Sequence, residues 1–181
     1  MEIIRHMTAD KGQKKTIRAE ENEEWFRTDE TGRILENLLP GEEKKLCLKE
    51  KNHLICIKRD SCFSDCIGKG GLVDSWGNRW GGWFAYSCRV QIPRRLASEC
   101  VKRNEEEPEE LIRDTFQKDV EKLFKTMASD DKTGLRNDEN FRNIIIDKIG
   151  DVFREHAEEL GLDVLFFTTG EFERREKQNE K

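Results

Sequence analysis

The sequence has no long apolar run. None of its 181 residues fall in a stretch that approaches the ~20 consecutive apolar residues needed by a membrane-spanning helix. The N-terminal segment, MEIIRHMTADKGQKK, also has no apolar stretch long enough for a secretory signal. We therefore expect no transmembrane segment and a cytoplasmic location, which still allows a place at the periphery of a membrane.

The sequence also lacks a Cys-x-x-Cys motif, although it has six cysteines. Disulfides are rare in a reducing compartment, so we expect these cysteines to be thiols or metal ligands. Their even number is no evidence of a disulfide framework.

The residue patterns of common catalytic sites are missing as well. The glycines at positions 68, 70 and 71 do not form the Gly-x-x-x-x-Gly-Lys-Ser/Thr loop that binds phosphate. The three histidines, His6, His53 and His156, have no neighbour in sequence that suggests a catalytic triad. We therefore expect a protein that is not an enzyme and has no catalytic residue.

What the sequence has in excess is charge. Charged residues make up 39% of the chain, against about 25% in a typical soluble domain. This excess belongs on the surface, in loops and in tails. The net charge of -5 provides no general attraction to polyanions, so nucleic acid is not the expected partner.

The first half of the chain has the pattern of short β-strands separated by turns. Runs of apolar and β-branched residues alternate with turn signals such as Pro40-Gly41, while residues 61–82 are rich in glycine and read as a loop. Trp83 to Ile92 alternates so that every second side chain would line one face of a strand. The predicted strands are residues 25–27, 33–39, 46–48, 54–57 and 83–92.

The second half has helical periodicity. After a short predicted helix over residues 94–101, Pro108 and its acidic neighbours suit a helix N-terminus, and an apolar stripe follows up to Met127. A second stripe ends at Leu160, with Gly161 in the position expected just after a helix.

This order of elements predicts an α+β fold. A mixed or antiparallel sheet from the N-terminal half would pack against two amphipathic helices, with a closing C-terminal strand over residues 162–168. We place a polar lead-in with a possible short strand at residues 1–22, a single α+β domain at residues 23–172 and a charged tail at residues 173–181.

Three segments carry a combined pattern of turns, strands and a helix end. They are Thr31-Gly32-Arg33-Ile34 leading to Leu39-Pro40-Gly41-Glu42, the strand from Gly82 to Pro93, and Glu159-Leu160-Gly161-Leu162-Asp163-Val164. This pattern covers roughly residues 23–172 and resembles the SPFH domain, also called band 7, of stomatin, prohibitin and flotillin-like proteins.

The resemblance implies a non-enzymatic scaffold that assembles with copies of itself, often on membranes. It supplies no site residues, because the family has no catalytic motif to carry over. The family's N-terminal membrane segment and its long C-terminal coiled coil are not present in this sequence. The chain is then either a stand-alone variant or a fragment of a longer anchored protein.

Cys62 and Cys66 are the candidate metal ligands. Their Cys-x-x-x-Cys spacing lies within the range used by zinc sites, and Cys47, His53 and Cys56 precede them closely. A zinc ion held here would make the chain a small zinc-stabilised binding module. The alternative is that Cys47 and Cys56, which lie in apolar strand patterns, act as small hydrophobic residues.

The segment from Asp74 to Tyr86 holds three of the four tryptophans. Trp76, Arg79 and Trp80 could form an exposed contact surface for a protein, or stack on the bases of single-stranded nucleic acid. The alternative is that these large rings fill the end of a β-core, which is where we expect Trp83.

The basic residues Arg94, Arg95, Lys102 and Arg103 form one further cluster. They would lie either on a solvated helix face or against phospholipid head groups. The sequence thus predicts a self-associating or protein-binding scaffold first, a zinc-stabilised module second and a binder of single-stranded nucleic acid third.

Overall fold

The computed structural model describes residues 3–8, 12–67, 72–73, 79–105, 107–128, 139–170 and 173–175. Strands that pair antiparallel are combined with helices in the second half of the chain, so the predicted α+β class is confirmed. No helix among these residues is long and apolar enough to cross a membrane. The elements are β1 (Ile4–Thr8), β2 (Gln13–Arg18), β3 (Glu23–Thr28), β4 (Ile34–Leu38), β5 (Glu43–Leu48), β6 (His53–Lys58), β7 (Cys62–Ile67), β8 (Leu72–Val73), β9 (Arg79–Gly81), β10 (Phe84–Val90), α1 (Pro93–Arg103), α2 (Pro108–Ala128), α4 (Glu139–Glu159), β11 (Leu162–Thr169) and β12 (Glu173–Arg175).

The helices begin and end close to the positions that the sequence predicts. α1 begins at Pro93 and α2 at Pro108, where the missing proline N–H would have no helical partner in any case. α4 ends at Glu159, and Gly161 follows with a φ of 76°. The predicted glycine at the end of the last helix is therefore confirmed.

Three segments contain more strands than the sequence predicted, which placed one possible short strand in the lead-in. β1 and β2 lie in the predicted lead-in, β7, β8 and β9 lie in the predicted loop and β12 lies in the predicted tail. Three of these strands pair with partners that are distant in sequence: β1 with β6, β2 with β5, and β12 with β9. Pairing with a distant strand, rather than local propensity, makes such short polar segments extended.

The chain divides into two compact units, each assembled from three segments. The changes from one unit to the other fall inside β7, β10, α2, α4 and β11, where no loop or change in composition marks them. The single α+β domain expected over residues 23–172 therefore stays a prediction. Unit 1 contains Met1–Phe63, Cys88–Ile112 and Ala157–Asp163, and unit 2 contains Ser64–Ser87, Arg113–His156 and Val164–Lys181.

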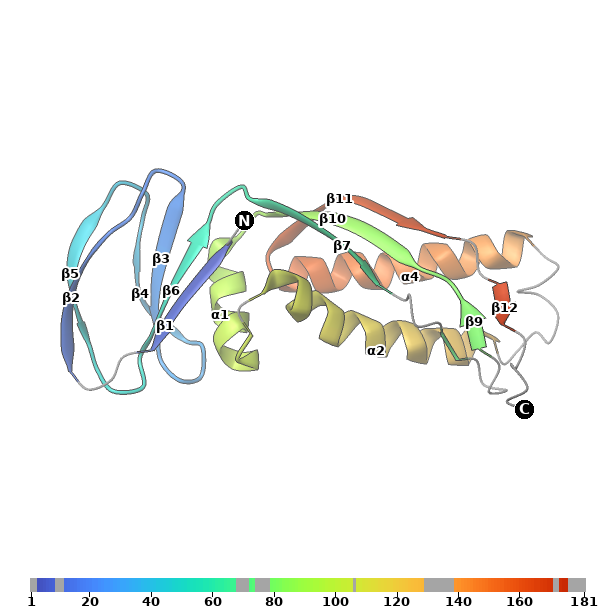
Figure 1. Ribbon diagram of the computed structural model, residues 1–181, viewed down its shortest axis with the longest axis horizontal. Helices are drawn as coiled ribbons and strands as arrows, with labels where there is room; N and C mark the ends of the chain where they lie inside the picture. Colours follow the sequence, from blue (N-terminus) through green and yellow to red (C-terminus); the bar gives the residue numbers. More distant parts are fainter. Residues whose placement is uncertain are drawn as a thin grey trace, which may run out of the picture. The chain divides into compact units, whose positions relative to one another are not determined.

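Unit 1 contains a four-stranded sheet of order β1-β6-β3-β4 and a two-stranded sheet of β2 and β5 (Figure 1). Trp25, Leu38 and Leu54 of the larger sheet pack with apolar residues of β2 and β5. α1 packs against β3 and β6 and buries Leu96. Since apolar groups cover both faces of the larger sheet, the four consecutive residues 54–57 of β6 are all buried.

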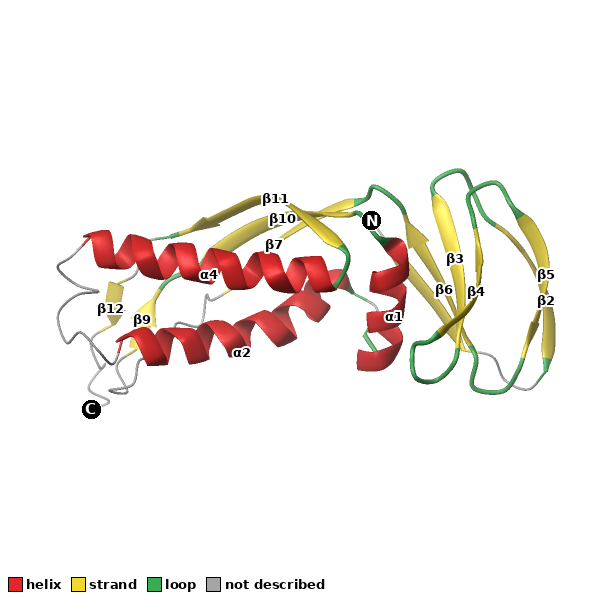
Figure 2. Ribbon diagram, turned by 180° about the vertical axis from the view of Figure 1, so that it is seen from behind, coloured by secondary structure: helices red, strands yellow, loops and turns green. Residues whose placement is uncertain are grey.

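Unit 2 places segments of α2 and α4 on the same side of strands β10 and β11 (Figure 2). Its core is a cluster of aromatic rings: Phe153 lies 4.9 Å from Phe116, from Phe167 and from Tyr86, measured between ring centroids. Phe84 lies 6.0 Å from Phe116, edge to face. These contacts stabilise the unit and orient Phe167 of β11 toward the helices.

Candidate functional site

β11 is the outermost strand of the sheet with order β11-β10-β7. Its inner side pairs with β10: the Gln91 N–H donates to the Gly161 carbonyl at 3.0 Å, and the Gly170 N–H donates to the Trp83 carbonyl at 2.8 Å. Within the described parts of the chain, no strand pairs with its outer side. The outer N–H and C=O groups of β11 therefore form an open edge, which we call the β11 edge.

The side chains in the middle of this strand are apolar. Residues 164–167 read Val-Leu-Phe-Phe, and Phe167 points into the aromatic cluster. Leu165 is 49% exposed and Phe166 is 54% exposed, so both faces of the strand carry an apolar side chain in contact with solvent. An edge strand with exposed apolar residues is a surface suited to another chain.

Trp83 extends this apolar surface. Its indole ring lies directly over Gly170, at a distance that would leave no room for a side chain at that position. The ring is nevertheless 42% exposed. The prediction that Trp83 belongs to the core is therefore wrong, because the ring covers a glycine at the surface instead of filling a cavity.

β11 has few of the features that normally prevent two edge strands from pairing. Such features include proline, lysine and charged side chains along the strand. The strand Leu162–Thr169 contains no proline and no lysine, and its single charged residue, Asp163, forms an ion pair with Arg89 at 2.6 Å. Nothing in the sequence of this strand therefore opposes pairing with a second strand.

β4, one of the two edge strands of the larger sheet of unit 1, also has an exposed leucine. Leu35 is 43% exposed there, a value close to that of Leu165. The next residue, Glu36, forms ion pairs with Arg27, at 3.2 Å, and with Lys44. β4 thus has one ion-paired charge, as β11 has, but only two consecutive apolar residues, Ile34 and Leu35, against four in β11. Leu35 is therefore an exposed leucine on an edge strand with less apolar surface, and it serves as a comparison for the β11 residues.

The two predicted zinc ligands lie on β7. In an extended strand, residues four positions apart have Cα atoms about 13 Å apart, whereas two thiolates on one zinc ion each lie about 2.3 Å from it. The structure therefore does not bring Cys62 and Cys66 together. In the part of the chain that is described, no group of three His, Cys, Asp or Glu side chains could hold a metal ion.

The structure does not describe the side chains of the predicted contact surface. Trp76 lies in a segment that the structure does not describe. Arg79 and Trp80 belong to β9, whose backbone pairs with β8 and β12. The prediction that these three side chains form an exposed surface stays a prediction.

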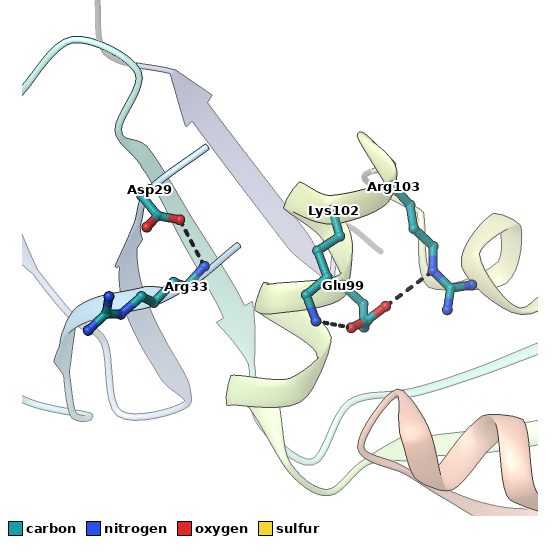
Figure 3. A network of polar contacts seen from close by, with 5 residues as sticks. All are labelled: Asp29, Arg33, Glu99, Lys102 and Arg103. Carbon is teal, nitrogen blue, oxygen red and sulfur yellow. Dashed lines mark hydrogen bonds and ion pairs between the residues drawn. The ribbon is translucent and has the colours of Figure 1, made fainter. Parts of the chain in front are cut away.

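Two residues of the basic cluster on α1, Lys102 and Arg103, have a carboxylate partner (Figure 3). Glu99 pairs with Lys102 at 2.7 Å and with Arg103 at 3.2 Å along the helix. In the same view, the Asp29 carboxylate accepts a hydrogen bond from the backbone N–H of Arg33 at 3.0 Å, in the turn between β3 and β4. For Lys102 and Arg103 these ion pairs favour a solvated helix face over one that binds lipid head groups. Arg95 donates instead to the backbone carbonyl of Glu158, at 2.9 Å.

Two of the three histidines belong to one contact that the sequence did not predict. Nε2 of His6 lies 2.7 Å from Nδ1 of His53, between β1 and β6. The third, His156 on α4, lies 2.7 Å from the carboxylate of Asp119 on α2 and so joins the two helices. The residues His6 and His53 are 47 positions apart, and only the pairing of β1 with β6 shows that they meet.

No protein family model matches the sequence, and no curated protein matches it. The β11 edge must therefore be judged by its own geometry. One sequence signal could have revealed it. A strand with one buried face alternates apolar and polar residues, whereas residues 164–167 are all apolar. The pattern predicts a closing strand over residues 162–168, but sequence alone does not show which strand lies at an edge.

Proposed function

We propose that this chain is a non-enzymatic self-association module in which β11 pairs with β11 of a second copy. The observation that carries the proposal is the exposure of Leu165 and Phe166 on an open strand edge. Pairing would join the two sheets into one and satisfy the backbone groups of both edges. It would also remove apolar side chains from water.

The strand is complementary to itself when two copies run antiparallel. A twofold axis through Phe166 places this residue opposite its own counterpart, Leu165 opposite Phe167, and Asp163 opposite Thr169. Aromatic and aliphatic cross-strand pairs are stabilising, and no like charges meet in this register. A second copy of the chain is therefore the occupant that we propose for this edge.

This proposal agrees with the scaffold that the SPFH resemblance implies, but it rests on the β11 edge and not on the resemblance. We also propose a cytoplasmic location. Support for it comes from the six free thiols, which a reducing compartment preserves.

The test is the mass of the protein in solution as a function of concentration. For the unaltered chain we expect sedimentation equilibrium to show a rise from the monomer mass toward twice that mass. Phe166→Lys places a charge at the centre of the paired strands and should raise the dimer dissociation constant by at least about tenfold, equivalent to ~1.4 kcal/mol.

Leu35→Lys is the matched control, because Leu35 is a similarly exposed residue on β4, an edge strand of the larger sheet of unit 1. It should leave the dissociation constant unchanged. A chain that stays monomeric over the whole concentration range would overturn the proposal. So would a Phe166→Lys variant that associates as strongly as the unaltered chain.

A further inference from the structure

His6 and His53 face each other across two paired strands of unit 1. Nε2 of His6 lies 2.7 Å from Nδ1 of His53, and the ring planes differ by 28°. The ring centroids are 5.0 Å apart. This separation is close to the largest that the contact between the two nitrogens allows, which is reached when both nitrogens lie on the line between the two centroids. The two nitrogens therefore point toward one another, and the rings do not lie face over face.

The backbone fixes this arrangement. In the antiparallel pairing of β1 with β6, Thr8 lies opposite His53 and His6 lies opposite Ile55. The two imidazoles are thus diagonal neighbours on the same face of the sheet. Ile4 and Ile55, which share that face, are buried and hold both strands in register. Two imidazole nitrogens are consequently placed on rigid elements before any ligand arrives.

Two carboxylates lie near the pair. Those of Asp29 and Glu30 act on the charge of His53 and would attract a positive ion, and Glu30 also pairs with Lys51 at 3.0 Å. Neutral imidazole is the form of histidine that binds metal ions.

We propose that His6 and His53 together bind one divalent late first-row transition-metal ion, such as Zn²⁺. Imidazole nitrogens suit zinc, copper and nickel, whereas magnesium and calcium prefer oxygen ligands. Two nitrogens at about 2.1 Å from a tetrahedral ion are about 3.4 Å apart, so small side-chain rotations from the observed separation would admit the ion.

Water completes the coordination of this ion. Among the described residues, no set of three His, Cys, Asp or Glu side chains is close enough to share a metal. A site with two protein ligands and open positions binds less tightly than a closed structural zinc site. It also leaves positions free for a ligand from a substrate or from another protein.

The test is a calorimetric titration of the metal-free chain with Zn²⁺ alone, in a buffer with a reductant that does not bind metal. We expect one ion per chain. His6→Gln and His53→Gln should each weaken binding by at least about tenfold, since each removes one of two ligands. His156→Gln is the matched control, because His156 lies elsewhere and contacts Asp119, and it should bind as the unaltered chain does.

A Cys62→Ser, Cys66→Ser double variant separates this site from the predicted thiol site. It should keep the full affinity. Binding that is lost in this variant but kept in both histidine variants would overturn the proposal, as would the absence of stoichiometric binding. Side-chain NMR of the unaltered chain provides a second measurement that needs no substitution: Zn²⁺ should shift the imidazole signals of His6 and His53 but not of His156.

Discussion

The buried thiols of Cys56 and Cys88 are unreactive. Cys56 lies within 3.4 Å of the Arg5 guanidinium, yet burial raises the pKa of its thiol to about 11. Burial likewise raises the pKa of Cys88 to about 12. Both groups therefore stay protonated at neutral pH, and thiolates are the forms that react or bind metal. The reading of Cys56 as a small hydrophobic residue is supported by its place in the core of unit 1.

Arg5 illustrates how one polar side chain is accommodated beside that core. It forms an ion pair with Glu23 and lies 5.2 Å from the centre of the Trp25 ring. Glu23 is also the acceptor for the Trp25 indole N–H, at 3.3 Å. A buried carboxylate is costly unless it is paired, and here two donors satisfy it.

At the scale of single residues, the pKa of His53 predicts how stability depends on pH. This pKa is lowered below its ordinary value of 6.5 in the folded state, so the unfolded chain binds a proton more readily. The contribution of neutral His53 is therefore complete above about pH 6.5 and is lost as pH falls through the lowered value. Urea unfolding should show a smaller free energy of unfolding at about pH 5.5 than at about pH 7.5.

His53→Gln should lose this part of the pH dependence, because glutamine does not titrate. His156→Gln provides the comparison, since that histidine belongs to a different contact, with Asp119. If the His53→Gln variant shows the same change between the two pH values as the unaltered chain, the assignment to His53 is wrong.

At the scale of elements, the junction between α4 and β11 decides where the edge strand starts. Gly161 has a φ of 76°, which lets the chain leave the helix and enter the strand directly. Its carbonyl accepts hydrogen bonds from the backbone N–H groups of Gln91 and Ile92, at 3.0 and 2.8 Å. A side chain at this position would place its Cβ 2.5 Å from the carbonyl oxygen of Ile92.

Gly161→Ala should therefore destabilise the protein for two reasons, backbone strain and this close contact. Strain at a positive φ costs about 1–2 kcal/mol, and the contact adds to it because backbone must move. Gly41→Ala is the control: its φ is 80°, but nothing lies within 4 Å of the position of a new Cβ. Urea unfolding should show a larger loss for Gly161→Ala, and equal losses would contradict the role of the contact.

At the scale of the whole molecule, self-association through β11 must couple to stability. A partner that binds only the folded state stabilises it by mass action. The melting temperature of the unaltered chain should therefore rise with protein concentration, while that of Phe166→Lys should rise less over the same range. Differential scanning calorimetry over a wide concentration range measures this difference. A melting temperature that is independent of concentration for both proteins would contradict association in the folded state.

Much of the fold was predictable because its helices follow local rules. Pro93, Pro108 and Gly161 lie at helix ends for reasons of backbone geometry, and these reasons act within a few residues. The short strands β1 and β2 were missed or only partly anticipated, because their partners, β6 and β5, lie far along the chain. The polar residues of these two strands show no clear strand pattern in the sequence, and only the pairing explains why they are extended.

The same distinction applies to the candidate sites. The sequence shows an apolar run at residues 164–167, but position in the sheet decides that Phe166 is exposed while Phe167 joins the aromatic cluster. Likewise, the spacing of Cys62 and Cys66 suggested a shared ion, whereas the extended conformation of β7 separates them.

The sequence by itself determined the class of fold, the ends of the helices and the closing strand, since periodicity and capping depend on neighbouring residues. Tertiary structure alone decided that β11 lies at an edge and that His6 meets His53. Both depend on which strands pair, and strand pairing is set by contacts between residues that are remote along the chain.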